Sequence, residues 1–141
     1  MVAIQEHVSN MLQQDVIQPA KSPWASNLVL TKKKDRSMRC YVDYRQLNSL
    51  TRKDAYPLPR TDMWLDAMSG ARWFSTFDLR SSYRKVAMKE ENSDKTAFVC
   101  CEGHFKFKTM LFGLCNAGAT FQRLMDMVMS GLAFEVAKGY F

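Results

Sequence analysis

The stretch Arg72-Trp-Phe-Ser-Thr-Phe-Asp-Leu79 places bulky apolar side chains on both faces of an extended chain. Successive side chains of a strand point to opposite sides of its sheet. One side would carry Trp73 and Phe77, and the other would carry Phe74 and Asp78. Large groups on both sides are typical of a strand that is buried from two directions. The stretch therefore predicts a central strand that ends at a carboxylate.

Further strands and helices are predicted on both sides of this stretch. Alternating or apolar runs between turn residues predict strands over 27–31, 38–43, 96–101 and 104–108. Apolar residues at helical spacing predict a first helix that ends before Pro19 and a last helix over 116–132. Shorter helices are expected over 45–50 and 61–68, with Gly70 as the left-handed residue after the second. This mixture predicts an α+β fold with a mostly antiparallel sheet.

The composition is that of one ordinary globular domain. The chain has 141 residues, of which 47% are hydrophobic and 24% charged, and this balance excludes wholesale disorder. No run approaches the ~18 apolar residues of a membrane span, and the N-terminal residues lack a secretory pattern. Four cysteines and two histidines show no zinc-ligand spacing, so reduced thiols are expected. We therefore expect an intracellular protein with no membrane partner, and the sequence leaves nucleus and cytoplasm open.

Positive charge is concentrated in one segment. The net charge is +6, yet residues 21–60 alone hold ten Lys and Arg against three Asp, a local charge of +7. A basic surface attracts an anionic partner such as nucleic acid. The alternative is that Lys32 to Lys34 form only the solvated tip of a hairpin.

Seven ordered blocks of sequence carry a resemblance to a known family. They are Ser22-Pro-Trp-Ala-Ser26, Lys32-Lys-Lys-Asp35, Val42-Asp-Tyr-Arg-Gln-Leu-Asn48, Tyr56-Pro-Leu-Pro-Arg60, Phe77-Asp-Leu-Arg-Ser-Ser-Tyr83, Lys95-Thr-Ala-Phe98 and Phe112-Gly-Leu-Cys-Asn-Ala-Gly-Ala-Thr-Phe-Gln-Arg-Leu-Met125. Together they resemble the reverse transcriptases of gypsy-type long-terminal-repeat retrotransposons and of retroviruses, in which the blocks follow the same order.

The resemblance implies a partial right-hand polymerase fold. A fingers-like part would take up about 1–60, and an incomplete palm about 61–141, with some finger elements interleaved. The family's reaction is template-directed deoxynucleotidyl transfer, in which two magnesium ions stabilise the attacking and leaving oxygens. The implied partners are an RNA or DNA template-primer and deoxynucleotides.

The resemblance also assigns roles to individual residues. Asp78 matches the first metal-binding carboxylate of the palm, and the backbone carbonyl of Leu79 lies beside it. Tyr83 matches the aromatic residue under the incoming sugar, and Phe112 matches a position that lines the nucleotide pocket. For both aromatic residues, ordinary core packing is the alternative.

Two basic residues match positions of the family's fingers that grip the triphosphate, Lys33 and Arg39. For Arg39, the alternative is a simple ion pair with an acid such as Asp43.

One departure from the family limits what this chain is expected to do. The family's other two catalytic aspartates lie in a Tyr-x-Asp-Asp hairpin, and these 141 residues contain no adjacent pair of aspartates. A single carboxylate cannot hold two magnesium ions, because Mg²⁺ requires several hard oxygen ligands and gives up its water reluctantly. We therefore expect a truncated polymerase domain that binds no magnesium productively and is inactive alone. A non-catalytic nucleic-acid-binding module, or one that pairs with a related polymerase chain, remains the alternative.

Overall fold

One five-stranded sheet organises the fold. The computed structural model describes residues 2–32, 34, 38–58 and 60–131. Its strands follow the spatial order β1-β5-β4-β2-β3. The strands are β1 Ile17–Pro19, β2 Ser26–Lys32, β3 Met38–Val42, β4 Phe98–Cys100 and β5 Gly103–Phe107. Only the β2–β4 pairing is parallel, so the predicted mostly antiparallel sheet is confirmed.

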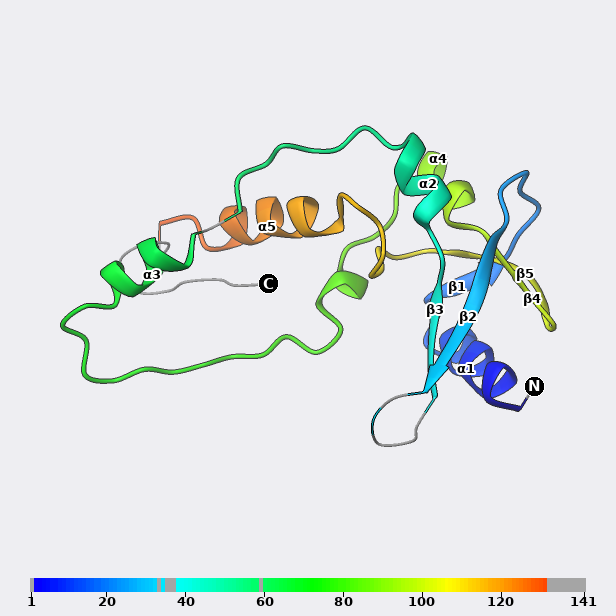
Figure 1. The fold of residues 1–141 in the computed structure, drawn as a ribbon, viewed down its shortest axis with the longest axis horizontal. Helices are drawn as coiled ribbons and strands as arrows, with labels where there is room; N and C mark the ends of the chain where they lie inside the picture. The colour runs from blue at the N-terminus through cyan, green and yellow to red at the C-terminus, as the bar shows by residue number, and fades with distance from the viewer. Residues whose placement is uncertain (1, 33, 35–37, 59, 132–141) are drawn as a thin grey trace.

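Helices and short turns connect these strands (Figure 1). The helices are α1 Val2–Gln13, α2 Arg45–Leu50, α3 Thr61–Ala67, α4 Glu90–Ser93 and α5 Ala117–Val128, and the 3-10 turns are η1 Ser82–Lys85 and η2 Asp94–Thr96. The helices expected near 4–12, 45–50, 61–68 and 116–132 are therefore all present. Gly70 has the predicted left-handed backbone, with φ of +85°. None of the helices in the described part of the chain is long and apolar enough to cross a bilayer.

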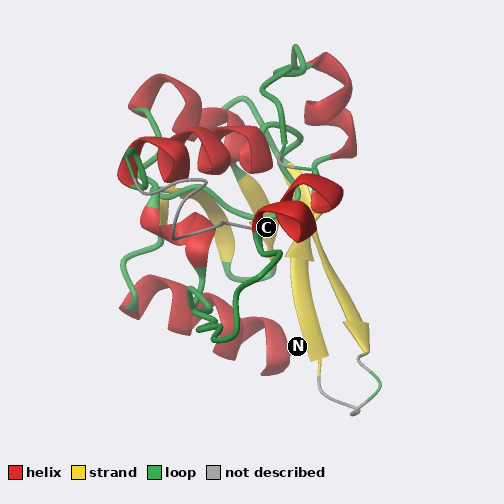
Figure 2. Cartoon of the chain, turned by 90° about the vertical axis from the view of Figure 1, so that its left-hand side faces the viewer, coloured by secondary structure: helices red, strands yellow, loops and turns green. Residues whose placement is uncertain are grey.

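The short strand β1 was not predicted. It pairs antiparallel with β5, with Ile17 opposite Phe107 and Pro19 opposite Phe105. Proline cannot donate to a ladder, and it is tolerated here because β1 lies at one edge of the sheet. The opposite edge is β3, and the β2–β3 hairpin projects away from the helices (Figure 2).

The main core lies between α1 and the sheet. Val8 and Met11 on α1 pack with Ile17 of β1 and with Phe98, Phe105 and Phe107 of the β4–β5 hairpin. Phe98 and Ile17 are among the largest fully buried side chains. Each such side chain contributes roughly 1.5–3 kcal/mol by leaving water, so this layer holds α1 on the sheet.

A smaller core surrounds the N-terminal half of α5. Phe121 is only 2% exposed and packs with Met110 and Ala117, and Tyr83 lies against the same cluster. The C-terminal half of α5 is different, because Met127 and Val128 are exposed. The predicted apolar face of this helix is therefore buried over its first turns only.

The prediction of a buried strand at 72–79 is wrong. These residues form an extended connection that runs alone along one side of the molecule in Figure 1. Trp73 is 92% exposed and Phe77 is 89% exposed. A strand needs a neighbouring backbone to satisfy its N–H and C=O groups, and no described segment pairs with this one. The buried face of α5 lies elsewhere, since Phe121 contacts Tyr83 and Met110.

Candidate functional site

Two of the candidate residues meet at the base of α5. Tyr83 comes from η1, and Phe112 comes from the loop that follows β5. Their ring centroids are 4.4 Å apart at an interplanar angle of 70°. Tyr83 also meets the buried ring of Phe121 edge-on at 5.5 Å. Edge-to-face contacts of this kind fix ring positions and add stability beyond burial.

The exposure of the pair differs between its members. Tyr83 is half-buried against the small core, whereas Phe112 is 67% exposed. Phe112 is therefore not an ordinary core residue. The pair presents an aromatic surface to solvent that is held in place from beneath by Phe121.

Among the described residues, no hydrogen bond, ion pair or ring contact joins Asp78 or Leu79 to Tyr83 or Phe112. Asp78 and Leu79 are both exposed and belong to the extended connection that precedes η1. No hydrogen bond, ion pair or ring contact within the described part of the chain joins Asp78 to another residue. Neighbouring Ser81 has a left-handed backbone, with φ of +52°, which turns the chain into η1.

The part of the chain that the structure describes does not hold a cluster of ligands that fits a magnesium site. Across the described ranges, no group of three or more His, Cys, Asp or Glu side chains converges on one point. Within these ranges, Asp78 belongs to no such cluster of potential metal ligands.

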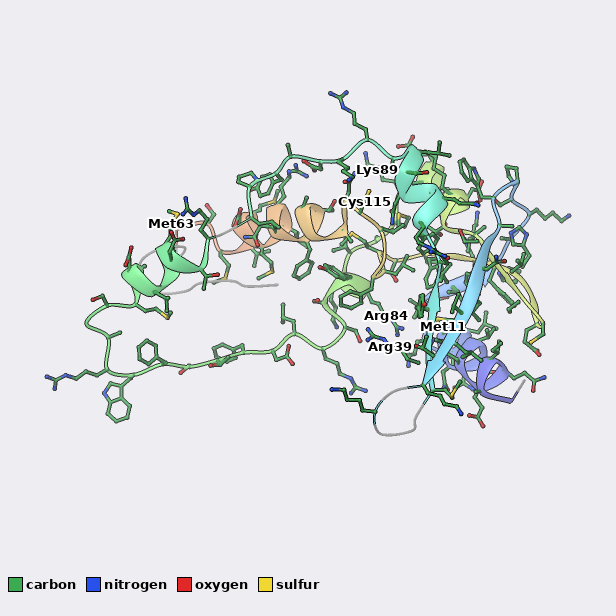
Figure 3. The ribbon with its side chains drawn as sticks, viewed as in Figure 1. Met11, Arg39, Met63, Arg84, Lys89 and Cys115 are labelled. Carbon is green, nitrogen blue, oxygen red and sulfur yellow. The ribbon has the colours of Figure 1, made fainter. Side chains whose placement is uncertain are left out.

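The basic candidates belong to the β2–β3 hairpin. Arg39 lies on β3, opposite Thr31 of β2, with its side chain exposed. In Figure 3, the labelled side chains of Arg39 and Arg84 lie in the region between β3 and η1 in this view. Asp43 pairs with Arg45 at 2.6 Å, and Arg39 makes no ion pair with any acid among the described residues. Lys33 lies outside the described residues.

The Asp43–Arg45 pair separates two hollows on the surface of the basic segment. One is a polar hollow of about 470 Å³ that reaches from Ser26 on β2 to Gln46 on α2. The other is lined by Tyr41 and Asn48 and reaches Gly113. The hydrogen bonds that Arg45 donates lower the pKa of Asp43, so this carboxylate stays ionised beside both hollows.

Two asparagines of the resembling blocks connect segments that are far apart in the sequence. The Asn48 side chain donates to the carbonyl oxygen of Gly113 at 2.7 Å and accepts from the backbone N–H of Cys115 at 2.9 Å. Gly113 has φ of +98°, and an added Cβ would meet the Tyr44 ring at 3.6 Å. Only glycine adopts this conformation at low cost. Asn48 therefore holds the loop that carries Phe112, a role that the sequence did not reveal.

Asn116, which directly precedes α5, makes a similar connection to the segment after α2. Its side chain accepts from the backbone N–H of Asp54 at 2.9 Å and donates to the carbonyl oxygen of Arg52 at 2.9 Å. Arg123 of α5 pairs with the Asp54 carboxylate at 2.8 Å and lies over the ring of Tyr56. The segment after α2 is thus fastened along α5. For Asn48 and Asn116, the sequence showed only that each is an amide residue within one of the blocks that resemble the family.

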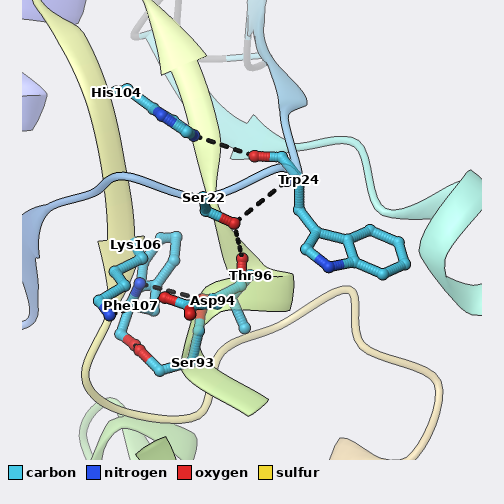
Figure 4. Close-up of polar contacts among 8 residues, drawn as sticks. All are labelled: Ser22, Trp24, Ser93, Asp94, Thr96, His104, Lys106 and Phe107. Atoms are coloured by element: carbon cyan, nitrogen blue, oxygen red, sulfur yellow. Dashed lines mark hydrogen bonds and ion pairs between the residues drawn. The ribbon is translucent and has the colours of Figure 1, made fainter. Parts of the chain in front are cut away.

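A third network fastens the block around Trp24 to the β4–β5 hairpin (Figure 4). Ser22 Oγ donates to the carbonyl oxygen of Asp94 at 2.7 Å, and Asp94 pairs with Lys106 at 2.7 Å. His104 Nε2 lies 2.9 Å from the carbonyl oxygen of Trp24. His104 therefore holds the two segments together.

Comparisons with known proteins agree on one family. The family described as "Reverse transcriptase (RNA-dependent DNA polymerase)" matches residues 31–137. The retrovirus-related Pol polyprotein from transposon 297 of Drosophila melanogaster is 38% identical over 136 residues, which cover 93% of this chain. The same match covers 13% of that polyprotein, so the chain spans a small part of its relative's length.

Solved structures show the same fold at lower sequence identity. The foamy viral protease-reverse transcriptase in complex with dsDNA has a TM-score of 0.77 and 19% identity over 93% of this chain, and 28% of that chain is covered. The same viral protein in complex with an RNA/DNA hybrid has a TM-score of 0.75 and 16% identity over 93% of this chain, and 18% of that chain is covered.

Proposed function

Because the chain belongs to the reverse transcriptase (RNA-dependent DNA polymerase) family, we propose that it forms the part of an RNA-directed DNA polymerase that contacts template and nucleotide. The observation that carries this proposal is the contact between Tyr83 and Phe112 at 4.4 Å. The two residues come from separate blocks of the resemblance and meet on a solvent-facing surface. The proposed fingers-like part takes up about 1–60 and the incomplete palm about 61–141.

The aromatic pair is suited to a nucleotide. Aromatic side chains stack on bases and sugars without regard to sequence. Tyr83 is held by Phe121 beneath it, and Phe112 stands exposed beside it. In this proposal Tyr83 lies under the sugar, and Phe112 lines the pocket.

The hairpin supplies the positive charge that phosphates need. The guanidinium of Arg39 has no hydrogen-bond or ion-pair partner among the described residues, which supports a contact with a phosphate. Lys33 and Arg39 are proposed to hold the triphosphate. The rest of the basic segment, with the two hollows beside Arg45, is proposed to contact the backbone of the template. The viral neighbours bound to dsDNA and to an RNA/DNA hybrid support nucleic acid as the partner.

The metal-dependent step is proposed to be absent from the 141-residue chain. Reverse transcriptases generally use divalent metal ions, which would stabilise the reacting phosphate oxygens. Asp78 and the carbonyl of Leu79 occupy the matching positions, yet no group of three or more His, Cys, Asp or Glu side chains gathers around Asp78 in the described ranges. The chain therefore binds template and nucleotide without joining them.

The test is binding to a fluorescently labelled primer–template duplex, followed by anisotropy across a salt series. The parent chain is expected to bind more weakly as salt rises, with a slope set by the number of phosphates that it neutralises. Charge reversal of Lys32, Lys33 and Lys34 to Glu is expected to flatten that slope by roughly 0.7–0.9 for each phosphate that the variant no longer neutralises.

The matched control is Lys89→Glu, because Lys89 is an exposed lysine that precedes α4, outside the basic segment. This variant is expected to keep the parent slope. An equal slope for the triple variant and the parent would assign the hairpin lysines to a solvated tip and would overturn the proposal.

A further inference from the structure

Gly118 lies in the first turn of α5, close to the hydroxyl of Tyr83. A Cβ added at this glycine would meet the Tyr83 hydroxyl oxygen at 3.9 Å, which is ordinary van der Waals contact. Apart from its chain neighbours and the backbone of its own helix, no other heavy atom of the described residues lies within 4 Å of that Cβ. An alanine would therefore fit at position 118 without displacing its surroundings.

The local backbone does not require a glycine either. Gly118 is a helical residue of α5 and does not have the positive φ that favours glycine. Glycine within a helix is destabilising relative to alanine, because it loses more backbone freedom on folding. Close packing of η1 on α5 does not explain the glycine, since contact with an alanine would not be tight. What glycine provides at this position is space beside the Tyr83 hydroxyl.

The ring of Tyr83 is held by aromatic contacts, but its hydroxyl is not held. Phe112 and Phe121 meet the ring edge-on, at centroid distances of 4.4 Å and 5.5 Å. The hydroxyl makes no hydrogen bond within the part of the chain that the structure describes. The hydroxyl end of the ring is therefore the end that can move, and Gly118 leaves the space into which it can move.

We propose that Gly118 allows the Tyr83 ring to yield to a 2′-hydroxyl on the incoming sugar, so that this site accepts ribonucleotides as well as deoxynucleotides. The inference rests on the proposed function, which places Tyr83 under the sugar. A closely packed ring would exclude the additional oxygen, because packed groups are displaced only at a cost. A ring with space behind its hydroxyl tilts toward α5 instead. Gly118 is thus a positioning residue, since it acts on the nucleotide only through Tyr83.

Equilibrium dialysis with ATP and dATP tests the proposal, because these two nucleotides differ only in the 2′-hydroxyl. The 141-residue chain is bound to a primer–template duplex whose first unpaired template base is thymine, and the nucleotides are supplied as magnesium complexes. The parent chain is expected to bind ATP and dATP with similar dissociation constants. Gly118→Ala is expected to raise the ratio of the ATP constant to the dATP constant about tenfold, the lower end of the effect of one methylene in a binding pocket.

A double-variant cycle checks that the effect passes through the Tyr83 hydroxyl. Tyr83→Phe removes the one atom that the new Cβ would meet. Adding Gly118→Ala to Tyr83→Phe is therefore expected to leave the ratio unchanged, since the coupling between the two positions is lost. Val128→Ala is the matched control, because it raises the helix propensity of α5 at the opposite end of the helix, and it is expected to keep the parent ratio.

The ratio separates this inference from a general effect on the fold. A merely structural change in α5 would shift both dissociation constants together and leave their ratio as it is in the parent. Nucleotide binding with the same ratio in the parent and in Gly118→Ala would overturn the inference and leave the proposed function standing. An equal rise in the Tyr83→Phe background would also overturn it. A chain that binds neither nucleotide would overturn the proposed function, and this inference with it.

Discussion

Replacing Phe121 with alanine is expected to destabilise the chain strongly, whereas the same replacement at Phe77 is expected to have almost no effect. The two side chains are identical, but Phe121 is 2% exposed and Phe77 is 89% exposed. Phe121 packs with Met110 and Ala117 and supports the ring of Tyr83. The apolar alternation of 72–79 had predicted that Phe77 would be buried as well.

The magnitude follows from burial. Truncating a buried phenylalanine to alanine costs about 3–5 kcal/mol, because apolar packing is removed and a cavity remains. The edge-to-face contact with Tyr83 adds about 0.5–1.5 kcal/mol. A substitution on the exposed segment usually changes stability by less than about 0.5 kcal/mol. Since a domain of this size has only ~5–15 kcal/mol of net stability, Phe121→Ala removes a large part of it.

The assay is urea unfolding followed by circular dichroism, at protein concentrations low enough to keep the chain monomeric. Phe121→Ala is expected to lower the urea midpoint or to abolish the cooperative transition, and Phe77→Ala is expected to unfold like the parent. A large loss of stability in Phe77→Ala would show that 72–79 is packed within the monomer. A parent-like Phe121→Ala would show that α5 is not docked on the small core.

Three further predictions concern single residues. Asn48→Ala removes both hydrogen bonds to the Gly113–Cys115 loop and is expected to cost about 1–3 kcal/mol in urea unfolding, whereas Ser49→Ala, whose hydroxyl bonds only within its own helix turn, should be close to neutral. Burial and the charge of Arg84 lower the pKa of His7, so the folded chain binds this proton less well than the unfolded chain. Stability is expected to fall as pH drops below about 6.5, and His7→Gln should flatten that dependence; equal pH profiles would contradict it. Burial raises the pKa of Tyr44 far above its ordinary value, so its stabilising contribution is present below about pH 10 and is lost at higher pH. Its ultraviolet ionisation signal, identified by comparison with Tyr44→Phe, should appear only as the chain unfolds.

The elements that sequence predicted correctly are those with local signals. The helix α1 and the β4–β5 hairpin follow from spacing, turn residues and apolar periodicity within a few neighbouring positions. The strand β1 could not be predicted in this way. It has only three residues, one of them Pro19, and it exists because the edge of β5 is available.

The error at 72–79 has a physical cause. An apolar alternation shows which side chains would gain from burial, but it does not show that a partner strand is present. Trp73 and Phe77 satisfy the pattern of a central strand and nevertheless lie exposed.

The sequence could predict which residues belong to the candidate site, but it could not predict how the fold brings them together. Resemblance named Tyr83 and Phe112 separately, and only the fold brings their rings into contact. Resemblance also gave no role to Asn48 or Gly113, because their importance lies in hydrogen bonds between distant segments. Asp78 shows the converse case, since it matches a catalytic position yet belongs to no group of three or more potential metal ligands in the described ranges.

Primer extension tests the central claim most directly. The purified 141-residue chain is incubated with a labelled primer–template and all four deoxynucleotides in magnesium and, separately, in manganese. The chain is expected to bind the duplex but to add no nucleotide, because the family's paired aspartates are absent from these residues and Asp78 alone cannot hold two metal ions. Template-dependent extension that disappears in Asp78→Asn would contradict the account, since it would show that this chain assembles a working metal site.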